Sequence, residues 1–157
     1  MIPAPDFAGE LMQITTSRFG NVDIEAEDIL FFPLGIAGFE HAQHFVLLAD
    51  ADNEAVAWLQ SATEPEIAMA VVSPRRFVPD YQVRVSRTQL KGLELGTTDD
   101  AHVLAVLGKG DSGLTLNLKA PVIVNLAARL GRQVITNDEQ PLQMELTRAN
   151  ASVRKIA

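Results

Sequence analysis

The segment HVLAVLGKGDSGLTLNLKAPVIVNLAARLGRQVITN, residues 102–137, alternates short apolar runs with clusters of turn residues. The runs HVLAVL and LTLNL are joined by GKGDSG, a glycine-rich link that favours a hairpin loop. The runs PVIVN and RQVITN follow, separated by LAARLG, in which Gly131 is predicted to supply a flexible corner. Apolar runs of roughly four to eight residues bounded by turn residues are typical of β-strands. The segment therefore predicts consecutive strands of an antiparallel sheet.

The same pattern extends toward the N-terminus and predicts an all-β sandwich or barrel. Gly20 and Asn21, in RFGN, tolerate the left-handed backbone that a hairpin turn needs, and DADNE predicts a second hairpin turn at residues 50–54. IAMAVVS is predicted to be a strand buried on both faces, whereas YQVRV alternates as a half-exposed strand. The strands predicted in this part of the chain are MQITT (12–16), VDIEAEDILFF (22–32), FVLLA (45–49), VAWLQS (56–61), IAMAVVS (67–73) and YQVRV (81–85).

One short helix is predicted to begin after Ser86. The Ser86 hydroxyl can cap the first turn while the Gln89 side chain reaches back, which is the spacing of a capping box. Gly92 and Gly96 follow closely and keep the helix short. The chain is therefore predicted to be a small, mainly β, single-domain antiparallel β-barrel-like fold with one short helix.

The C-terminal end allows two interpretations. PLQMELT alternates as a strand, yet the apolar residues from Leu142 to Ile156 recur at spacings of four and three, which place them on one face of a helix. We favour a strand for residues 142–147 because it continues the β pattern. Residues 148–157 are then a tail that is free or becomes helical on binding.

Composition excludes several classes of protein. The 157 residues are 47% hydrophobic, which suffices for the core of one ordinary domain. The net charge of −7 opposes binding to nucleic acid and favours a basic protein partner. The absence of cysteine removes disulfides, thiolate nucleophiles and most structural zinc sites. The N-terminus lacks the pattern of a signal peptide and no apolar run approaches a membrane span, so we expect a cytoplasmic chain that does not enter the membrane.

The sequence offers little catalytic or ligand-binding chemistry. Glu40, His41 and His44 share a face if their segment is helical, and they then have the spacing of metal ligands. The simpler interpretation is two ordinary surface histidines, because no third histidine lies near them in the sequence. No nucleophile elbow is present, and no glycine-rich phosphate loop precedes a helix. We therefore predict no catalytic residue, no metal site, no cofactor and no enzymatic activity.

The stretch FFPLGIAGFEH, residues 31–41, is unusually apolar for a turn. Pro33 ends the strand ILFF because it cannot donate to a ladder, and Gly35 and Gly38 allow backbone angles that other residues resist. Ile36 and Phe39 have two possible uses in such a loop. They fold inward as a plug for the end of the barrel, or they face outward as an apolar anchor for a partner.

Five blocks, taken together and in order, resemble the FliW family of flagellar assembly factors: FGNVDI, DILFFPLGIAGFE, FVLL, AVVSP and NLKAPVIVNLAARLGRQVI. The family usually has proline at the position of Ala37. The resemblance covers roughly residues 12–146 and divides the chain into an N-terminal extension at 1–11, a FliW-like β domain at 12–146 and a C-terminal tail at 147–157. Nothing that the family does is carried onto the two terminal segments.

The resemblance implies a small cytoplasmic protein that is not an enzyme, binds flagellin and antagonises CsrA, an RNA-binding translational repressor. It thereby implies that flagellin synthesis is coupled to flagellin export. The terminal helical region of flagellin would present an apolar stripe, for which Ile36 and Phe39 are anchor candidates. The acidic charge is compatible with steering toward a basic CsrA dimer.

Other residues in the matching blocks divide into polar ones, for which a structural and a binding role are equally open, and turn-shaping ones. The further partner-binding candidates are Glu40, Asn117, Asn125, Arg129, Arg132 and Gln133. The predicted turn-shaping residues are Gly20, Pro33, Gly35, Gly38, Pro121 and Gly131. The competing hypothesis is a small β-barrel enzyme, or a binder of a flavin or metal, with the barrel mouth as its pocket.

Overall fold

The computed structural model describes residues 11–97 and 100–146 and confirms the mainly β prediction. One short α-helix, α1, lies among the described residues, together with three single turns of 3-10 helix. The strands are β1 (Leu11–Thr16), β2 (Gly20–Glu25), β3 (Leu30–Phe31), β4 (His44–Ala49), β5 (Val56–Ser61), β6 (Ala68–Val72), β7 (His102–Gly110), β8 (Gly113–Asn125), β9 (Leu130–Gln133) and β10 (Met144–Glu145). The helical segments are η1 (Ala26–Asp28), η2 (Pro74–Arg76), α1 (Arg87–Leu90) and η3 (Lys91–Leu93).

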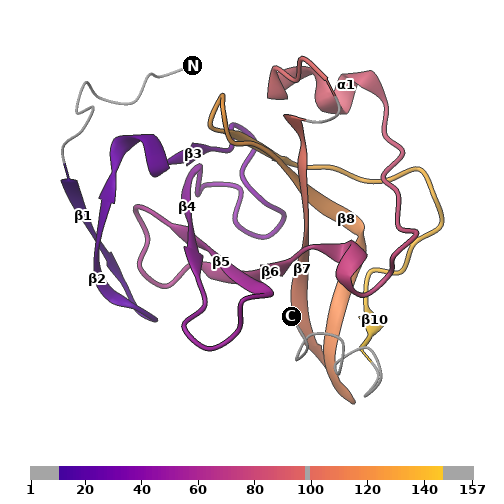
Figure 1. The fold of residues 1–157 in the computed structure, drawn as a ribbon, viewed down its shortest axis with the longest axis horizontal. Helices are drawn as coiled ribbons and strands as arrows, with labels where there is room; N and C mark the ends of the chain where they lie inside the picture. The colour runs from indigo at the N-terminus through magenta and orange to yellow at the C-terminus, as the bar shows by residue number, and fades with distance from the viewer. Residues whose placement is uncertain (1–10, 98–99, 147–157) are drawn as a thin grey trace.

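Strands β3 to β9 close into a barrel. The hydrogen-bonded order is β8-β7-β6-β5-β4-β3-β9, and β9 pairs back onto β8, while β10 adds to the outer side of β8. Figure 1 shows the β1–β2 hairpin at one side of the molecule and the long β7 and β8 strands at the other. The β3–β9 pair is parallel, an exception within the predicted antiparallel fold. Closure pairs the strand edges that an open sheet would leave exposed.

An irregular stretch in the middle of β8 lets the two halves of this strand pair with different strands. Leu104 pairs with Val122 and Val106 pairs with Asn117, so that residues 118–121 face the single residue Ala105. The Asn117 side-chain oxygen accepts hydrogen bonds from the backbone amides of residues 119 and 120, at 3.1 and 2.9 Å. Extra residues on one strand bend it and increase its twist. The first half of β8 can therefore pair with β10 and the second half with β9.

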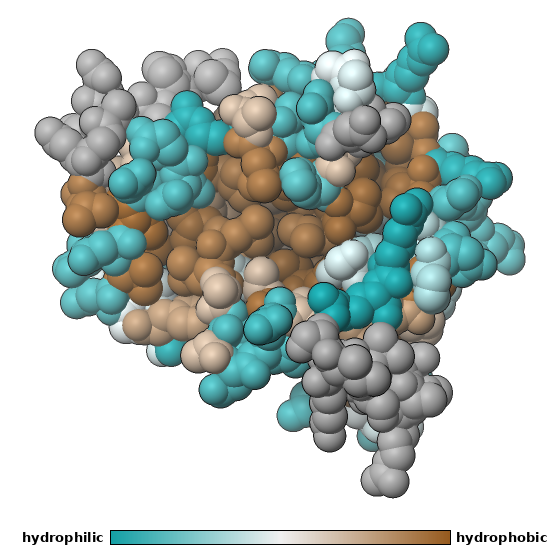
Figure 2. All heavy atoms as spheres, in the orientation of Figure 1, coloured by the Kyte–Doolittle hydropathy of each residue, from teal (hydrophilic) through white to brown (hydrophobic). Residues whose placement is uncertain are grey.

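The barrel interior holds the main hydrophobic core. Phe32 and Phe45 lie at its centre, with ring centroids 5.3 Å apart in an edge-to-face arrangement. The β1–β2 hairpin packs outside the barrel, where Ile14 and Ile24 cover Val46 of β4. Leu47 and Met69 pack against this core and are half-buried. Figure 2 shows hydrophobic residues gathered across the middle of the face that Figure 1 presents, with hydrophilic residues around them.

Gly131 does not form the predicted corner. It lies inside β9, and a Cβ added there would be 2.2 Å from Cζ of Phe32, so the glycine is required by the close approach of the ring. The left-handed residue of the β8–β9 turn is instead Arg129, with φ of 58°. The prediction of a flexible glycine corner is therefore wrong, because the constraint at residue 131 comes from packing.

Two predicted strands, VDIEAEDILFF and IAMAVVS, are longer than the strands in the structure. VDIEAEDILFF is interrupted by η1, where the Asp28 carboxylate accepts a hydrogen bond from the Glu25 amide at 2.8 Å and caps the turn. IAMAVVS contains β6, but only Val71 and Val72 in that strand are buried, since its first three residues are half-buried. Burial on both faces is thus wrong for the first part of this strand.

YQVRV is not a strand, although its alternation of burial is real. Tyr81 is buried, Val83 and Val85 are half-buried, and the residues between them are exposed. The segment lies over the outside of the barrel and enters no ladder. The Arg84 amide donates to the Thr136 hydroxyl at 3.0 Å, and the Arg84 carbonyl accepts from the Asn137 amide at 2.6 Å. Packing of one side of an extended chain on the barrel produces the same sequence pattern as a half-exposed strand.

The predicted helix cap is present, but the predicted capping box is not. The Ser86 hydroxyl accepts a hydrogen bond from the Gln89 amide at 3.4 Å, and α1 ends at Leu90. The Gln89 side chain does not reach back. It bonds the backbone of Ile135, accepting from the amide at 2.8 Å and donating to the carbonyl at 3.1 Å. Gln89 therefore ties the helix to the chain beyond β9.

The C-terminal prediction can be assessed as far as residue 146. Met144 and Glu145 form β10, paired with Leu116 and Thr115 of β8, which agrees with the strand interpretation. The N-terminal extension and the C-terminal tail fall almost wholly outside the described residues, since β1 begins at Leu11. In the part of the chain that the structure describes, no helix has the length and apolar character needed to cross a membrane.

Candidate functional site

The apolar loop between β3 and β4 is built from two tight turns. The Gly35 amide donates to the Phe32 carbonyl at 2.9 Å, and the Phe39 amide donates to the Ile36 carbonyl at 2.7 Å. Gly35 has a φ of 66°, and a Cβ there would lie 2.5 Å from the backbone oxygen of Glu40. Only glycine accommodates both constraints. The chain thus returns on itself, and the side chains of residues 34–39 point in different directions.

The two apolar anchor candidates of this loop lie in different environments. Ile36 is 3% exposed and belongs to the barrel core, so the inward, plug-like alternative describes this residue. Phe39 is 39% exposed and Leu34 is 61% exposed. The loop therefore presents apolar surface to solvent through Phe39 and Leu34, whereas Ile36 has almost no surface to offer a partner. A binding role for Phe39 stays a prediction.

Side chains from outside the loop hold its backbone in place. The Gln133 side chain accepts a hydrogen bond from the Ala37 amide at 2.9 Å and donates one to the Ala120 carbonyl at 3.1 Å. The Gln43 side chain donates to the Pro33 carbonyl at 2.8 Å. Fixing a loop before it binds reduces the entropy lost on association. Gln133 thus joins the loop to β8, an association that the sequence did not predict.

Glu40 stabilises the second turn of the same loop. Its carboxylate accepts a hydrogen bond from the Gly38 amide at 3.0 Å, where Gly38 has a φ of 89°. This bond, followed by one from its own backbone amide, lowers the pKa of the exposed Glu40 carboxyl below its ordinary value. Glu40 is therefore a fixed negative charge beside the exposed Phe39 ring.

The remaining polar candidates make hydrogen bonds within the protein and are spread over several places. Asn125 is buried and donates to the carbonyls of Leu93 and Glu94 at 2.9 and 3.3 Å. Arg129 donates to the Ala26 carbonyl at 3.4 Å, and Arg132 donates to the Thr88 carbonyl at 3.2 Å. Asn117 shapes the irregular part of β8, where Pro121 also lies. Of the polar candidates outside the loop, only Gln133 contacts it. The structure therefore brings Gln133 together with the loop residues Ile36, Phe39 and Glu40.

The histidines near the loop do not have the geometry of a metal site. Residues 40 and 41 form a turn and His44 begins β4, so no helical face brings them together. His41 Nε2 lies 2.9 Å from a Glu64 carboxylate oxygen, and the His44 ring lies over Phe31, with centroids 5.3 Å apart. Within residues 11–97 and 100–146, no group of three or more histidine, cysteine or acidic residues is placed to hold a metal ion.

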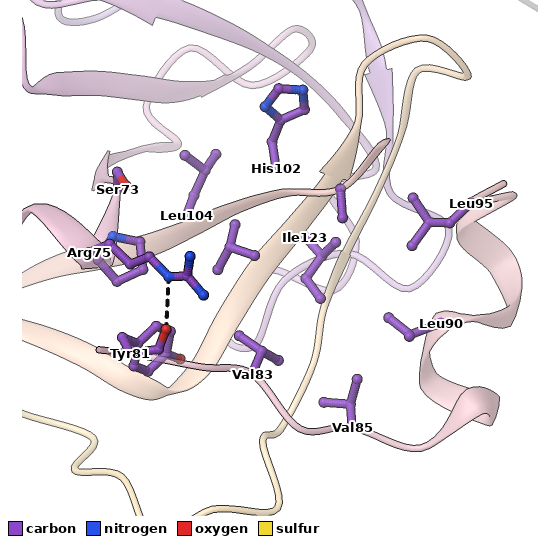
Figure 3. A pocket seen from close by; sticks show the side chains of 13 residues that line it. Ser73, Arg75, Tyr81, Val83, Val85, Leu90, Leu95, His102, Leu104 and Ile123 are labelled. Atoms are coloured by element: carbon purple, nitrogen blue, oxygen red, sulfur yellow. Dashed lines mark hydrogen bonds between the residues drawn. The ribbon is translucent and has the colours of Figure 1, made fainter. Parts of the chain in front are cut away.

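A groove outside the barrel was missed by the sequence reasoning. It has a volume of about 630 Å³ and lies between the segment 81–95 and strands β7 and β8. Figure 3 shows Val83, Val85, Leu90, Leu95 and Ile123 along it, with Arg75 bonded to the Tyr81 carbonyl at one end. His102 and Leu104 project from the other side of β7, as alternation along a strand requires. The signal for the groove was the half-exposed YQVRV pattern.

These observations define a small closed β-barrel protein that carries an apolar loop held by hydrogen bonds and a separate apolar groove. A family model described as FliW protein matches residues 13–146 of the chain. The chain belongs to the FliW family, as the resemblance of its sequence blocks predicted.

Individual relatives agree with this assignment. The flagellar assembly factor FliW of Bdellovibrio bacteriovorus is 41% identical over 129 residues, which cover 81% of this chain and 74% of the relative. That of Moorella thermoacetica is 40% identical over 127 residues, covering 79% of this chain and 80% of the relative. A crystal structure of the flagellar assembly factor FliW superposes with a TM-score of 0.77 at 29% identity, covering 85% of this chain and 95% of that chain. These relatives are named as assembly factors and not as enzymes.

Proposed function

We propose that this chain is a cytoplasmic regulator of flagellar assembly that binds flagellin and antagonises the translational repressor CsrA. When flagellin accumulates, it occupies the protein and leaves CsrA free to repress flagellin synthesis. When flagellin is exported, the protein becomes available to bind CsrA again. The observation that carries this proposal is the family match over residues 13–146, together with relatives named as flagellar assembly factors.

The charge of the chain supports a basic partner such as CsrA. Residues 19–74, which we call the acidic segment, contain ten aspartate and glutamate residues and no lysine or arginine. This segment includes strands β2 to β6 and the turns between them. The Arg18 guanidinium, from just before the segment, lies over the Trp58 ring, so the acidic segment is predominantly but not purely acidic in space. A region with an excess of one sign steers a partner of the opposite sign and raises its association rate. The same surface repels RNA, so the proposed antagonism acts through contact with CsrA itself.

The apolar loop supports a partner that offers apolar side chains. Phe39 and Leu34 are exposed on a backbone that Gln133 and Gln43 hold in place. Aromatic anchors on a fixed scaffold are typical of the residues that dominate protein–protein affinity. An apolar stripe on a helical region of flagellin is a suitable counterpart.

Isothermal titration of the purified protein tests the proposal, with flagellin and CsrA encoded by the same genome titrated separately. We expect both proteins to bind with a saturable heat. Absence of binding by either one at low salt, with the protein shown to be folded by circular dichroism, would contradict the proposal.

A further inference from the structure

The groove between the segment 81–95 and β7 is flanked by a basic stretch of chain. Residues 75–91, which we call the basic segment, contain five lysine and arginine residues and only one acidic residue, Asp80. The five are Arg75, Arg76, Arg84, Arg87 and Lys91. The chain as a whole has a net charge of −7, and the acidic segment directly precedes this one. Positive charge is therefore concentrated beside the groove in an otherwise acidic protein.

Most of this positive charge is available to a partner. Arg84 lies 3.8 Å from the Asp138 carboxylate. For the other four cations, no carboxylate of the described residues lies within ion-pair distance. Arg75 uses only its Nε to donate to the Tyr81 carbonyl, at 2.9 Å. Arg87 and Lys91 are exposed. The described residues that line the groove include no acidic side chain.

The groove continues past α1. Leu90 and Leu95 line it from one side and also line a second depression of about 690 Å³. Two cations, Arg87 and Lys91, and one carboxylate, Glu94, border this second depression. The two depressions thus share an apolar ridge that has cations beside it. An extended surface of this kind suits a length of polypeptide better than a compact small molecule, which prefers an enclosed pocket.

We propose that this groove binds an amphipathic segment of a partner protein, with apolar side chains lying on Leu90 and Leu95 and carboxylates facing Arg87 and Lys91. The inference rests on the proposed function and assigns one of its two partners to this surface. CsrA, as a basic protein, is repelled by the basic segment and is directed to the acidic segment. The occupant of the groove is therefore a segment of flagellin.

Two substitutions test the groove, each with a matched control on the β7–β8 hairpin. Lys91→Glu reverses a charge beside the groove. Lys109→Glu makes the same change on an exposed residue far from it, since Lys109 lies about 23 Å along β7 from His102, which lines the groove, at roughly 3.3 Å per residue. Leu90→Ala shortens the shared apolar ridge, and Leu114→Ala shortens an exposed leucine that pairs with Lys109. Circular dichroism and melting establish that each variant is folded.

The affinity of each variant for flagellin and for CsrA is measured by titration at two salt concentrations. We expect Lys91→Glu and Leu90→Ala to weaken flagellin binding by at least about fivefold, or about 1 kcal/mol, a loss that only a minority of interface residues exceed. The controls should change the affinity by less than about twofold. The loss for Lys91→Glu should shrink at high salt, because salt screens exposed charges. CsrA affinity should not fall in any of the four variants.

The outcomes separate the two proposals. Failure of the wild-type protein to bind flagellin overturns the proposed function and, with it, the assignment of the groove. Normal flagellin binding by wild type and by both groove variants overturns the groove assignment alone and indicates another occupant, such as a small amphiphile. Loss of CsrA binding instead of flagellin binding overturns the assignment of partners to surfaces.

Discussion

Replacing Gly131 by alanine tests the packing that closes the barrel. The added Cβ would lie 2.2 Å from Cζ of Phe32, and ordinary contacts of this kind fall between 3.4 and 4 Å. The ring must therefore move by more than an ångström, yet Phe32 is completely buried in the core. Overpacking a core usually costs about 1–3 kcal/mol, and we expect the upper end because the displaced group is a whole ring. At roughly 2–4 °C per kcal/mol for a domain of this size, the melting temperature should fall by about 6–12 °C.

A double-mutant cycle assigns the cause of this loss. The free energy of unfolding is measured by urea denaturation for Gly131→Ala, Phe32→Leu and the double variant. If the ring is the obstacle, Gly131→Ala should cost at least about 1 kcal/mol less in the Phe32→Leu background. Gly92→Ala is the control, because a Cβ at Gly92 meets nothing within 4 Å. Equal effects of the two glycine substitutions, or full additivity in the cycle, would refute the reasoning.

Three further predictions concern the loop, one ionisable group and the charge of the surface. Phe39→Ala should weaken the binding of one partner by more than about 1 kcal/mol with little change in melting temperature. Ile36→Ala, in the core, should instead lower the free energy of unfolding by about 2–5 kcal/mol. A large loss of stability from Phe39→Ala would show that its ring is part of the core. Burial raises the pKa of Tyr81, the one tyrosine of the chain, from 10.0 to about 12, so the stabilisation from its neutral form should be complete below pH 10 and lost as the pH rises through 12. Absorbance at the tyrosinate band measures this titration directly, and a native midpoint equal to that in denaturant would contradict it. Association with CsrA should slow as salt rises, because steering between exposed charges is screened, and stopped-flow rates that do not depend on salt would remove the electrostatic part of the account.

The hairpins of this protein could be predicted because their signals are local. The DADNE turn is an example, since the Asp50 carboxylate accepts hydrogen bonds from the amides of Asp52 and Asn53 at 3.1 and 3.0 Å. The helix cap at Ser86 is another. In each case the residue that determines the backbone is within three positions of the bond it makes. Such features depend little on the rest of the fold.

The barrel closure and the groove could not be predicted from local patterns. The closing pair joins Phe31 in β3 to Leu130 in β9, and each strand is too short to have a distinct periodicity. The Gln133 bond to Ala37 joins residues 96 positions apart. The YQVRV pattern predicts a strand because an extended segment packed on a barrel alternates in the same way. Contacts between distant segments determine all three features.

The position of the candidate residues was predicted only in part. Glycine, proline and aromatic side chains together are unusual in a loop and indicate a candidate site there. The structure places Phe39 on the surface of the loop and Ile36 in the core. The polar residues of β8, β9 and the turn between them are candidates by their chemistry, but their hydrogen-bond partners lie far away in the sequence, as with Asn125 and Leu93. The basic segment was visible in the sequence, yet its meaning depended on the groove beside it.

Separate surfaces for the two partners would determine how one partner displaces the other. If flagellin lies in the groove and CsrA lies on the acidic segment, the two partners do not share a binding surface. One then displaces the other only by steric overlap between the bound partners or through a coupling free energy between the two sites. A coupling of about 1–3 kcal/mol changes an affinity by about 5- to 150-fold. Steric overlap and coupling both lower the affinity for one partner when the other is bound, so the exchange of partners can be measured in either case.

The most direct measurement follows CsrA bound to a labelled RNA by fluorescence anisotropy, with this protein and then flagellin added in turn. The account predicts that the protein releases RNA from CsrA and that flagellin restores the CsrA–RNA complex in proportion to its concentration. If the protein leaves the CsrA–RNA complex unchanged, or if flagellin has no effect after the RNA has been released, the proposed partner exchange is contradicted.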